Sequence, residues 1–100
     1  MKIHFFEIQL QTTTPVAFLD ITERVQSMVD QSRVQNGMVL VYSQHTTSAI
    51  RVNESEKNLM NDVNTFLEKL APVEAGYGHD RNPVDGRKNA HAHLHSWLLS

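Results

Sequence analysis

The chain has 100 residues, enough for one small domain and hardly enough for two. Nine basic and eleven acidic residues give a net charge of −2, so no overall field favours binding to nucleic acid or membranes. Cysteine is absent, which excludes disulfides, thiolate metal sites and cysteine nucleophiles and fits a reducing compartment. There is neither a signal-peptide core nor a run of roughly 18 apolar residues. We therefore expect a cytoplasmic protein without nucleic-acid or membrane partners.

Four segments have the pattern of β-strands. The stretch HFFEIQL alternates between two faces and predicts a half-buried strand over residues 2–12, and VAFLD predicts a short second strand over residues 16–20. The apolar run MVLVY at residues 38–42 is typical of a doubly buried strand. Residues 48–53 alternate again, so SQHTT at residues 43–47 is expected to be a tight connection between paired strands.

Three segments have helical patterns. Apolar residues recur at helical spacing within residues 20–32 and 54–72, and a last short helix is expected over residues 90–99, after a long loop at residues 73–88. Gly37 is expected to adopt positive φ at the end of the first helical unit. The alternation of strands and helices predicts an α+β domain. The residues suited to cap these helices are Asp20 or Thr22, Ser55 and Asn89, and the apolar face of the second helix comprises Leu59, Val63, Phe66, Leu67 and Leu70.

Six histidines in 100 residues raise the prospect of a chemical site, because histidine changes charge near neutral pH and is the commonest metal ligand. His45 follows the apolar run at residues 38–42 and precedes Thr46 and Thr47, whose hydroxyl and N–H groups are suited to hold an anion. The alternative is a turn histidine that packs or bonds locally.

Two further places carry polar residues of the right kinds. Asn53 and Glu54 lie at a strand-to-helix junction, where a carboxylate can bind metal, act as a base, or simply favour the start of a helix. His79 and Asp80 lie in the glycine-rich loop, where they can supply ligands or be an exposed loop pair.

The segment HAHLH has two interpretations. On a strand its three imidazoles would share one face, whereas on a helix His91 and His95 share a face and His93 points elsewhere. The helical interpretation is preferred, so the three histidines cannot all serve one site. No HExxH, Walker A or GxSxG motif is present. Four scattered cations are either phosphate ligands or a solvated surface: Arg51, Arg81, Arg87 and Lys88.

The chain resembles the YjbQ family, also called UPF0047 and often labelled "secondary thiamine-phosphate synthase enzyme". The resemblance rests on GMVLVYSQHTTSAIRVNESEKNLMNDVNTFLEKLAP, then YGHD, then NAHAHLHSWLLS. It implies a β-sandwich with two to three helices, assembled as a homotrimer around a threefold axis. The family continues with strands that carry a GTWQ motif, which this chain lacks. We therefore expect residues 1–100 to form a single domain of this family that is incomplete at its C-terminus.

The resemblance also implies which residues form a site. Its histidines are expected to converge on a divalent metal, zinc or magnesium, or on a small phosphorylated substrate. The family label implies a reaction that joins a pyrimidine pyrophosphate to a thiazole phosphate and expels pyrophosphate. The rival interpretations are a non-catalytic metal- or phosphate-binding trimeric module and a structural protein. The expected catalytic residues are His45, Glu54 and Asp80, and the expected substrate-binding residues are Thr46, Thr47 and Asn53. The expected metal ligands are His45, His79 and His93. Asp62, His91 and His95 also match family positions, the last two less securely.

Overall fold

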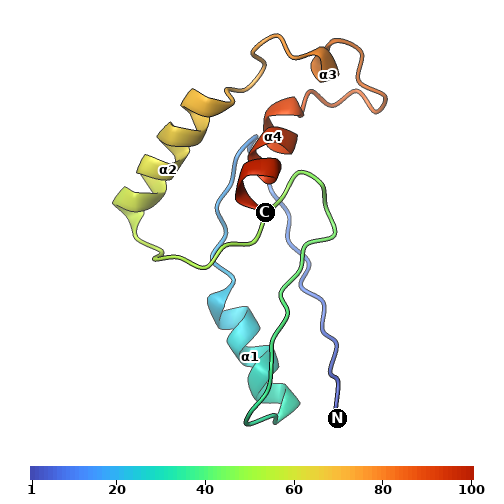
Figure 1. Cartoon of the computed structure of the whole chain (residues 1–100), viewed down its shortest axis with the longest axis vertical. Helices are drawn as coiled ribbons and strands as arrows, with labels where there is room; N and C mark the ends of the chain where they lie inside the picture. The colour runs from blue at the N-terminus through green and yellow to red at the C-terminus, as the bar shows by residue number, and fades with distance from the viewer.

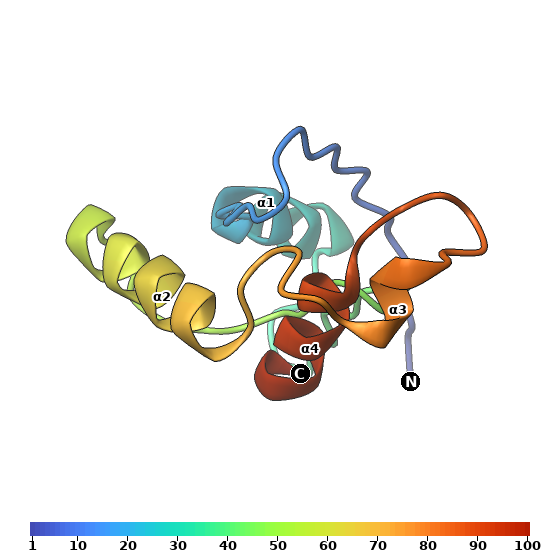
Figure 2. The same cartoon turned by 90° about the horizontal axis from the view of Figure 1, so that it is seen from above.

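Four helices joined by irregular segments make up the computed structural model, which describes all of residues 1–100. The helices are α1 (Thr22–Ser32), α2 (Lys57–Leu70), α3 (Gly78–Arg81) and α4 (Ala90–Leu99). Figures 1 and 2 show that α4 lies between α2 and α3, with α1 at the other end of the molecule. None of these helices has both the length and the apolar character needed to cross a bilayer.

The predicted α+β fold with a β-sandwich is wrong, because the structure contains no strand. Of its 34 backbone–backbone hydrogen bonds, 25 lie within helices, and the other 9 join residues no more than four positions apart. Alternation along residues 2–12 and 48–53, the short segment 16–20 and the apolar run 38–42 all fit strands, but a strand exists only where its N–H and C=O groups pair with a neighbour. The chain is therefore helical and irregular.

Helix α1 begins where the side chain of Asp20 accepts hydrogen bonds from Thr22, at 3.0 Å from the backbone N and 2.6 Å from the hydroxyl. Both hydrogen bonds lower the pKa of the Asp20 carboxyl, and the bond from the Thr22 hydroxyl has the larger effect. The helix ends at Arg33, which adopts a left-handed conformation with φ of 58°. Gly37 has no positive φ, contrary to expectation. The apolar residues at helical spacing within residues 20–32 are half-buried in the structure: Ile21, Val25, Met28 and Val29.

Helix α2 is capped by Glu56, whose carboxylate accepts from the Leu59 N–H at 2.7 Å. The predicted cap, Ser55, does not serve that role. The apolar face is confirmed only in part, because Leu67 is buried whereas Phe66 and Leu70 are exposed.

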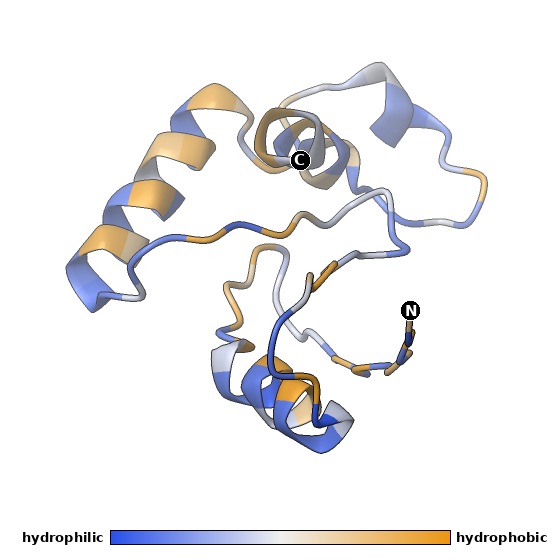
Figure 3. Ribbon diagram, turned by 60° about the horizontal axis from the view of Figure 1, so that its bottom comes forward, coloured by the Kyte–Doolittle hydropathy of each residue, from blue (hydrophilic) through white to orange (hydrophobic).

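The interior is small and lies where the end of α2 meets α4. The radius of gyration is 16.3 Å, against about 13 Å for a typical compact domain of this length. Figure 3 shows apolar residues along the irregular segments as well as on the helices. Half of the buried residues are polar, so side-chain hydrogen bonds matter unusually for this packing. The six buried residues are Leu67, Ala71, Asp80, Ala90, His91 and His95.

Two histidines of α4 bind the helix to the rest of the chain. His95 Nε2 donates to the carbonyl oxygens of Ala71 (2.9 Å) and Leu67 (3.2 Å), at the C-terminal end of α2. His91 Nε2 donates to the Pro15 carbonyl at 3.1 Å. The two rings lie edge to face at 5.7 Å, which confirms that His91 and His95 share one helical face. Both are structural histidines in this chain.

Replacing His95 by alanine is expected to lower the free energy of unfolding by about 1–3 kcal/mol, because the Ala71 carbonyl loses its donor, while the Leu67 carbonyl keeps its bond from the Ala71 N–H. Urea denaturation followed by far-ultraviolet circular dichroism measures this change. His4→Ala removes an exposed histidine and should change the free energy by less than about 0.5 kcal/mol. Equal urea midpoints for His95→Ala and His4→Ala would contradict the assignment.

Candidate functional site

The segment that carries His45 forms a turn, as the sequence predicts. The turn lies at Thr46–Thr47 and is closed by a hydrogen bond between the hydroxyls of Ser43 and Ser48. The Ser48 hydroxyl also donates to the His45 carbonyl at 3.2 Å. The side chains of His45, Thr46 and Thr47 are exposed and make no hydrogen bond, so they are free to meet a ligand.

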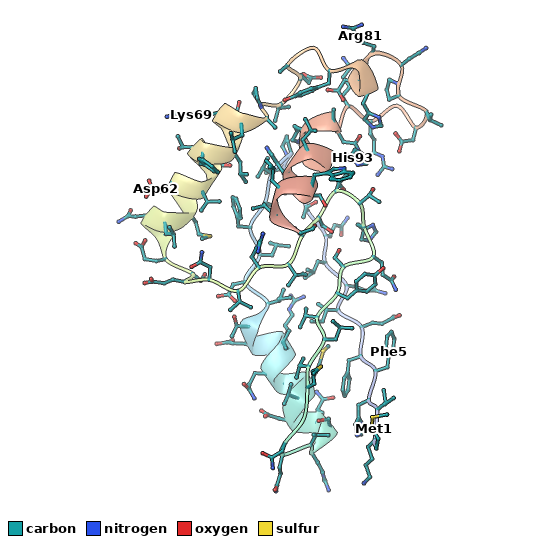
Figure 4. The ribbon with its side chains drawn as sticks, viewed as in Figure 1. Met1, Phe5, Asp62, Lys69, Arg81 and His93 are labelled. Atoms are coloured by element: carbon teal, nitrogen blue, oxygen red, sulfur yellow. The ribbon has the colours of Figure 1, made fainter.

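This turn is attached to α4. The Ser96 hydroxyl donates to the Ser48 carbonyl at 2.8 Å across 48 residues of sequence. Ser96 follows His93 by three positions, so the two side chains lie on neighbouring parts of one helical face. In Figure 4 the labelled His93 projects from α4 on the side where the turn lies. The turn and His93 therefore face the same region.

His79 and His93 come together and are called the histidine pair. Their ring centroids are 4.9 Å apart and their planes are nearly perpendicular, at 83°. His79 is exposed on α3, and His93 is half-buried on α4. His79 Nε2 lies 3.1 Å from the Asn89 side-chain oxygen. Two of the three predicted metal ligands thus lie side by side.

Asp80, expected to be catalytic, is 7% exposed and caps α4. Its Oδ1 accepts from the Ala90 N–H at 3.0 Å, which satisfies one of the free donors at the helix start. Its Oδ2 is buried without a hydrogen-bond partner. Asn89 occupies the cap position but makes no capping bond with its side chain. Asp80 thus positions the helix that carries His93.

The remaining predicted residues lie apart from the histidine pair. Asn53 Oδ1 accepts from the Glu54 N–H at 2.7 Å, and both residues are exposed just before α2. The Glu54 carboxylate makes no hydrogen bond or ion pair. Asp62 lies on the side of α2 that is remote from His93 (Figure 4). No contact brings Glu54 or Asp62 to the pair.

Metal coordination by one chain does not fit this arrangement. No group of three or more histidine, aspartate or glutamate side chains is placed to hold a metal ion. Zinc sites in proteins use three or four ligands, and the pair supplies two. Coordination of zinc or magnesium by His45, His79 and His93 stays a prediction.

Two of the four cations that the sequence singles out are engaged in ion pairs. The Arg87 guanidinium donates to Asp85 and lowers the pKa of that carboxyl, while the same bond raises the pKa of Arg87. Lys88 lies 3.6 Å from a Glu74 oxygen. Of the four, Arg51 and Arg81 make no ion pair.

One hollow in the surface lies away from the histidine pair. It has a volume of about 420 Å³, and residues 7–9 and α1 line it. No histidine lines it, and its walls are mostly exposed side chains. We place the candidate site at the histidine pair, because there side chains from separate segments converge through defined bonds.

Asn89 and Ser96 were missed as site residues by sequence reasoning. Asn89 was assigned to capping, and its bond to His79 spans 10 residues, which no local pattern reveals. The three-residue spacing of Ser96 from His93 indicates that both lie on one side of the helix. The hydrogen bond from Ser96 to Ser48 spans 48 residues, so the sequence alone does not predict it.

Comparison with known proteins identifies relatives along nearly the whole chain. A family model described as "UPF0047 protein YjbQ-like" matches residues 6–100. A "UPF0047 protein" of Methanothermobacter thermautotrophicus is 40% identical over 99 residues, which are 99% of this chain and 66% of the relative. A "UPF0047 protein" of Archaeoglobus fulgidus is 44% identical over 93 residues, which are 93% of this chain and 68% of the relative. The "UPF0047 protein YugU" of Bacillus subtilis is 28% identical over 84% of this chain and 62% of the relative.

The chain therefore spans about two thirds of the length of the curated relatives it matches. No solved structure matches it.

Replacing Asp80 by alanine should destabilise the first turn of α4, because the Ala90 N–H loses its capping acceptor. Loss of a capping acceptor costs about 0.5–2 kcal/mol, so the Ala90 amide should exchange its hydrogen several-fold faster. Asp80→Asn keeps an oxygen acceptor and should change the exchange rate less. Amide hydrogen exchange measured by nuclear magnetic resonance (NMR) tests both variants, and an unchanged Ala90 rate in Asp80→Ala would contradict the capping role.

Proposed function

This chain belongs to the UPF0047, YjbQ-like family, and we propose that its histidine pair binds the phosphate group of a small phosphorylated substrate. The observation that carries the proposal is the edge-to-face contact of His79 and His93, with His79 held by Asn89. Imidazole nitrogens serve both as donors and as acceptors to phosphate oxygens. The attached turn adds support, because Thr46 and Thr47 present free hydroxyl groups.

The finer proposal is a transferase reaction like that of thiamine-phosphate synthase. A new bond forms between the pyrimidine and thiazole compounds while the bond to the departing pyrophosphate oxygen breaks, and the electron pair leaves on that oxygen. Donors that face the leaving oxygen stabilise the charge that develops there. In this scheme the pair and the turn hold the phosphate groups, and His45 or Glu54 orients the substrate or accepts a proton.

The rival is a non-catalytic phosphate-binding module. It needs the same histidine pair but no turnover, so binding and catalysis must be measured separately.

Pyrophosphate titration of the ¹⁵N-labelled chain, followed by NMR, tests the proposed site. We expect chemical-shift changes at His79, His93 and the turn. His79→Ala and His93→Ala each remove a hydrogen bond to a charged group, about 1.5 kcal/mol, and should weaken binding roughly tenfold. His4→Ala is the matched control and should bind like the unmodified chain. Equal affinity for all four proteins would refute the site.

The assay for thiamine phosphate separates the enzyme from the binding module. Turnover that falls in His79→Ala supports the transferase. Binding of pyrophosphate without product formation from the two substrates identifies a binding module.

The proposed assembly is a homotrimer. Exposed apolar side chains support self-association, among them Met38, Leu40 and Val52, which are 95%, 88% and 100% exposed. Sedimentation equilibrium tests this proposal: a mass of three 11.4 kDa chains is expected, and the mass of a single chain contradicts it.

A further inference from the structure

Asn89 is bonded to both members of the histidine pair. Its side-chain oxygen lies 3.1 Å from His79 Nε2. Its backbone carbonyl accepts from the N–H groups of Ala92 at 3.0 Å and His93 at 3.2 Å, in the first turn of α4. One residue therefore fixes the ring of His79 and the backbone of His93.

The side chain of Asn89 is available for this bond because another residue caps the helix. Asparagine at a cap position ordinarily turns its side chain toward the first N–H groups of its own helix. Here the Ala90 N–H is satisfied by Asp80 Oδ1, and Asn89 makes no capping bond. Two hydrogen bonds between neighbouring residues, His79 to Asn89 and Ala90 to Asp80, thus join α3 to the start of α4.

The bond to Asn89 defines which nitrogen of His79 carries hydrogen. An amide oxygen only accepts hydrogen bonds, so the shared hydrogen belongs to His79 Nε2. In a neutral imidazole the other nitrogen, Nδ1, then keeps its lone pair. The Nδ1 atom makes no hydrogen bond within the chain, and the residue is exposed. Nδ1 is therefore the ring atom of His79 that is left for a ligand.

We propose that Asn89 is a positioning residue that holds His79 as the Nε2–H tautomer against His93, so that His79 meets its ligand through Nδ1. A fixed tautomer decides the direction of the hydrogen bond: His79 accepts from a P–OH group, while His93 and the turn remain to donate to the unprotonated oxygens. The statement that His79 meets a ligand through Nδ1 rests on the proposed function. The statement that Asn89 fixes the tautomer and position of the His79 ring rests on the contacts of Asn89 alone.

The experiment uses histidine side-chain ¹H–¹⁵N NMR on the full chain without ligand. We expect the hydrogen of His79 on Nε2, slowed in its exchange with water, and a nuclear Overhauser effect between the rings of His79 and His93. Asn89→Ala removes the acceptor, so the Nε2–H signal and the inter-ring effect should be lost. Asn89→Asp keeps an oxygen acceptor and should retain both, which also covers the case in which Asn89→Ala fails to fold. Asn64→Ala, an exposed position on α2, is the matched control.

A hydrogen on Nδ1 in the unmodified chain, or both signals retained in Asn89→Ala, would overturn the positioning role. So would their loss in a folded Asn89→Asp variant. A pyrophosphate titration of the same variants is read independently. If Asn89→Ala loses both signals yet binds pyrophosphate with unchanged affinity, the positioning role stands and the phosphate site at the histidine pair fails. If its affinity falls roughly five- to tenfold, both stand.

Discussion

The packing of this chain depends on the hydrogen bonds from His95 to the C-terminal carbonyls of α2. The last carbonyls of a helix have no partner inside the helix and carry the negative end of its dipole. A buried imidazole N–H is a suitable donor for them, and it brings α4 against Leu67 and Ala71, the most deeply buried apolar residues. With so little apolar surface buried, the position of α4 rests on this polar contact as much as on hydrophobic packing.

The orientation of α4 then separates its histidines into two roles. Successive residues of an α-helix are about 100° apart, so His93 points away from the face shared by His91 and His95. That face is bound to α2 and to the N-terminal segment at Pro15. The other side carries His93 and Ser96, which meet His79 and the turn at residues 43–48. The helix is thus a scaffold on one side and part of the candidate site on the other.

The sequence predicted what is local. Helices α1 and α2 follow from apolar periodicity, α4 follows from the cap residue Asn89 after the long loop, and the turn at Thr46–Thr47 follows from the change of pattern around SQHTT. The strands were not predictable in the same way, because a strand requires a partner and alternation does not identify one. The site has the same limit: the bond from Asp80 to Ala90 and the contact of His79 with His93 join residues that are distant in sequence. The family pattern marked His79 and His93, but only the structure shows that Asn89 joins them.

The candidate site is therefore built differently from a pocket in a packed core. Its three segments, α3, the start of α4 and the turn, are each held by one or two hydrogen bonds rather than by surrounding apolar side chains. A net hydrogen bond contributes only about 1 kcal/mol, so each contact fixes a direction more than it adds stability. A phosphate that bridges the histidine pair and the turn would bind where these segments already face each other. The entropy lost on binding is smallest where a ring is already fixed, so in the proposed site His79, with its bond to Asn89, is the expected first contact of the ligand.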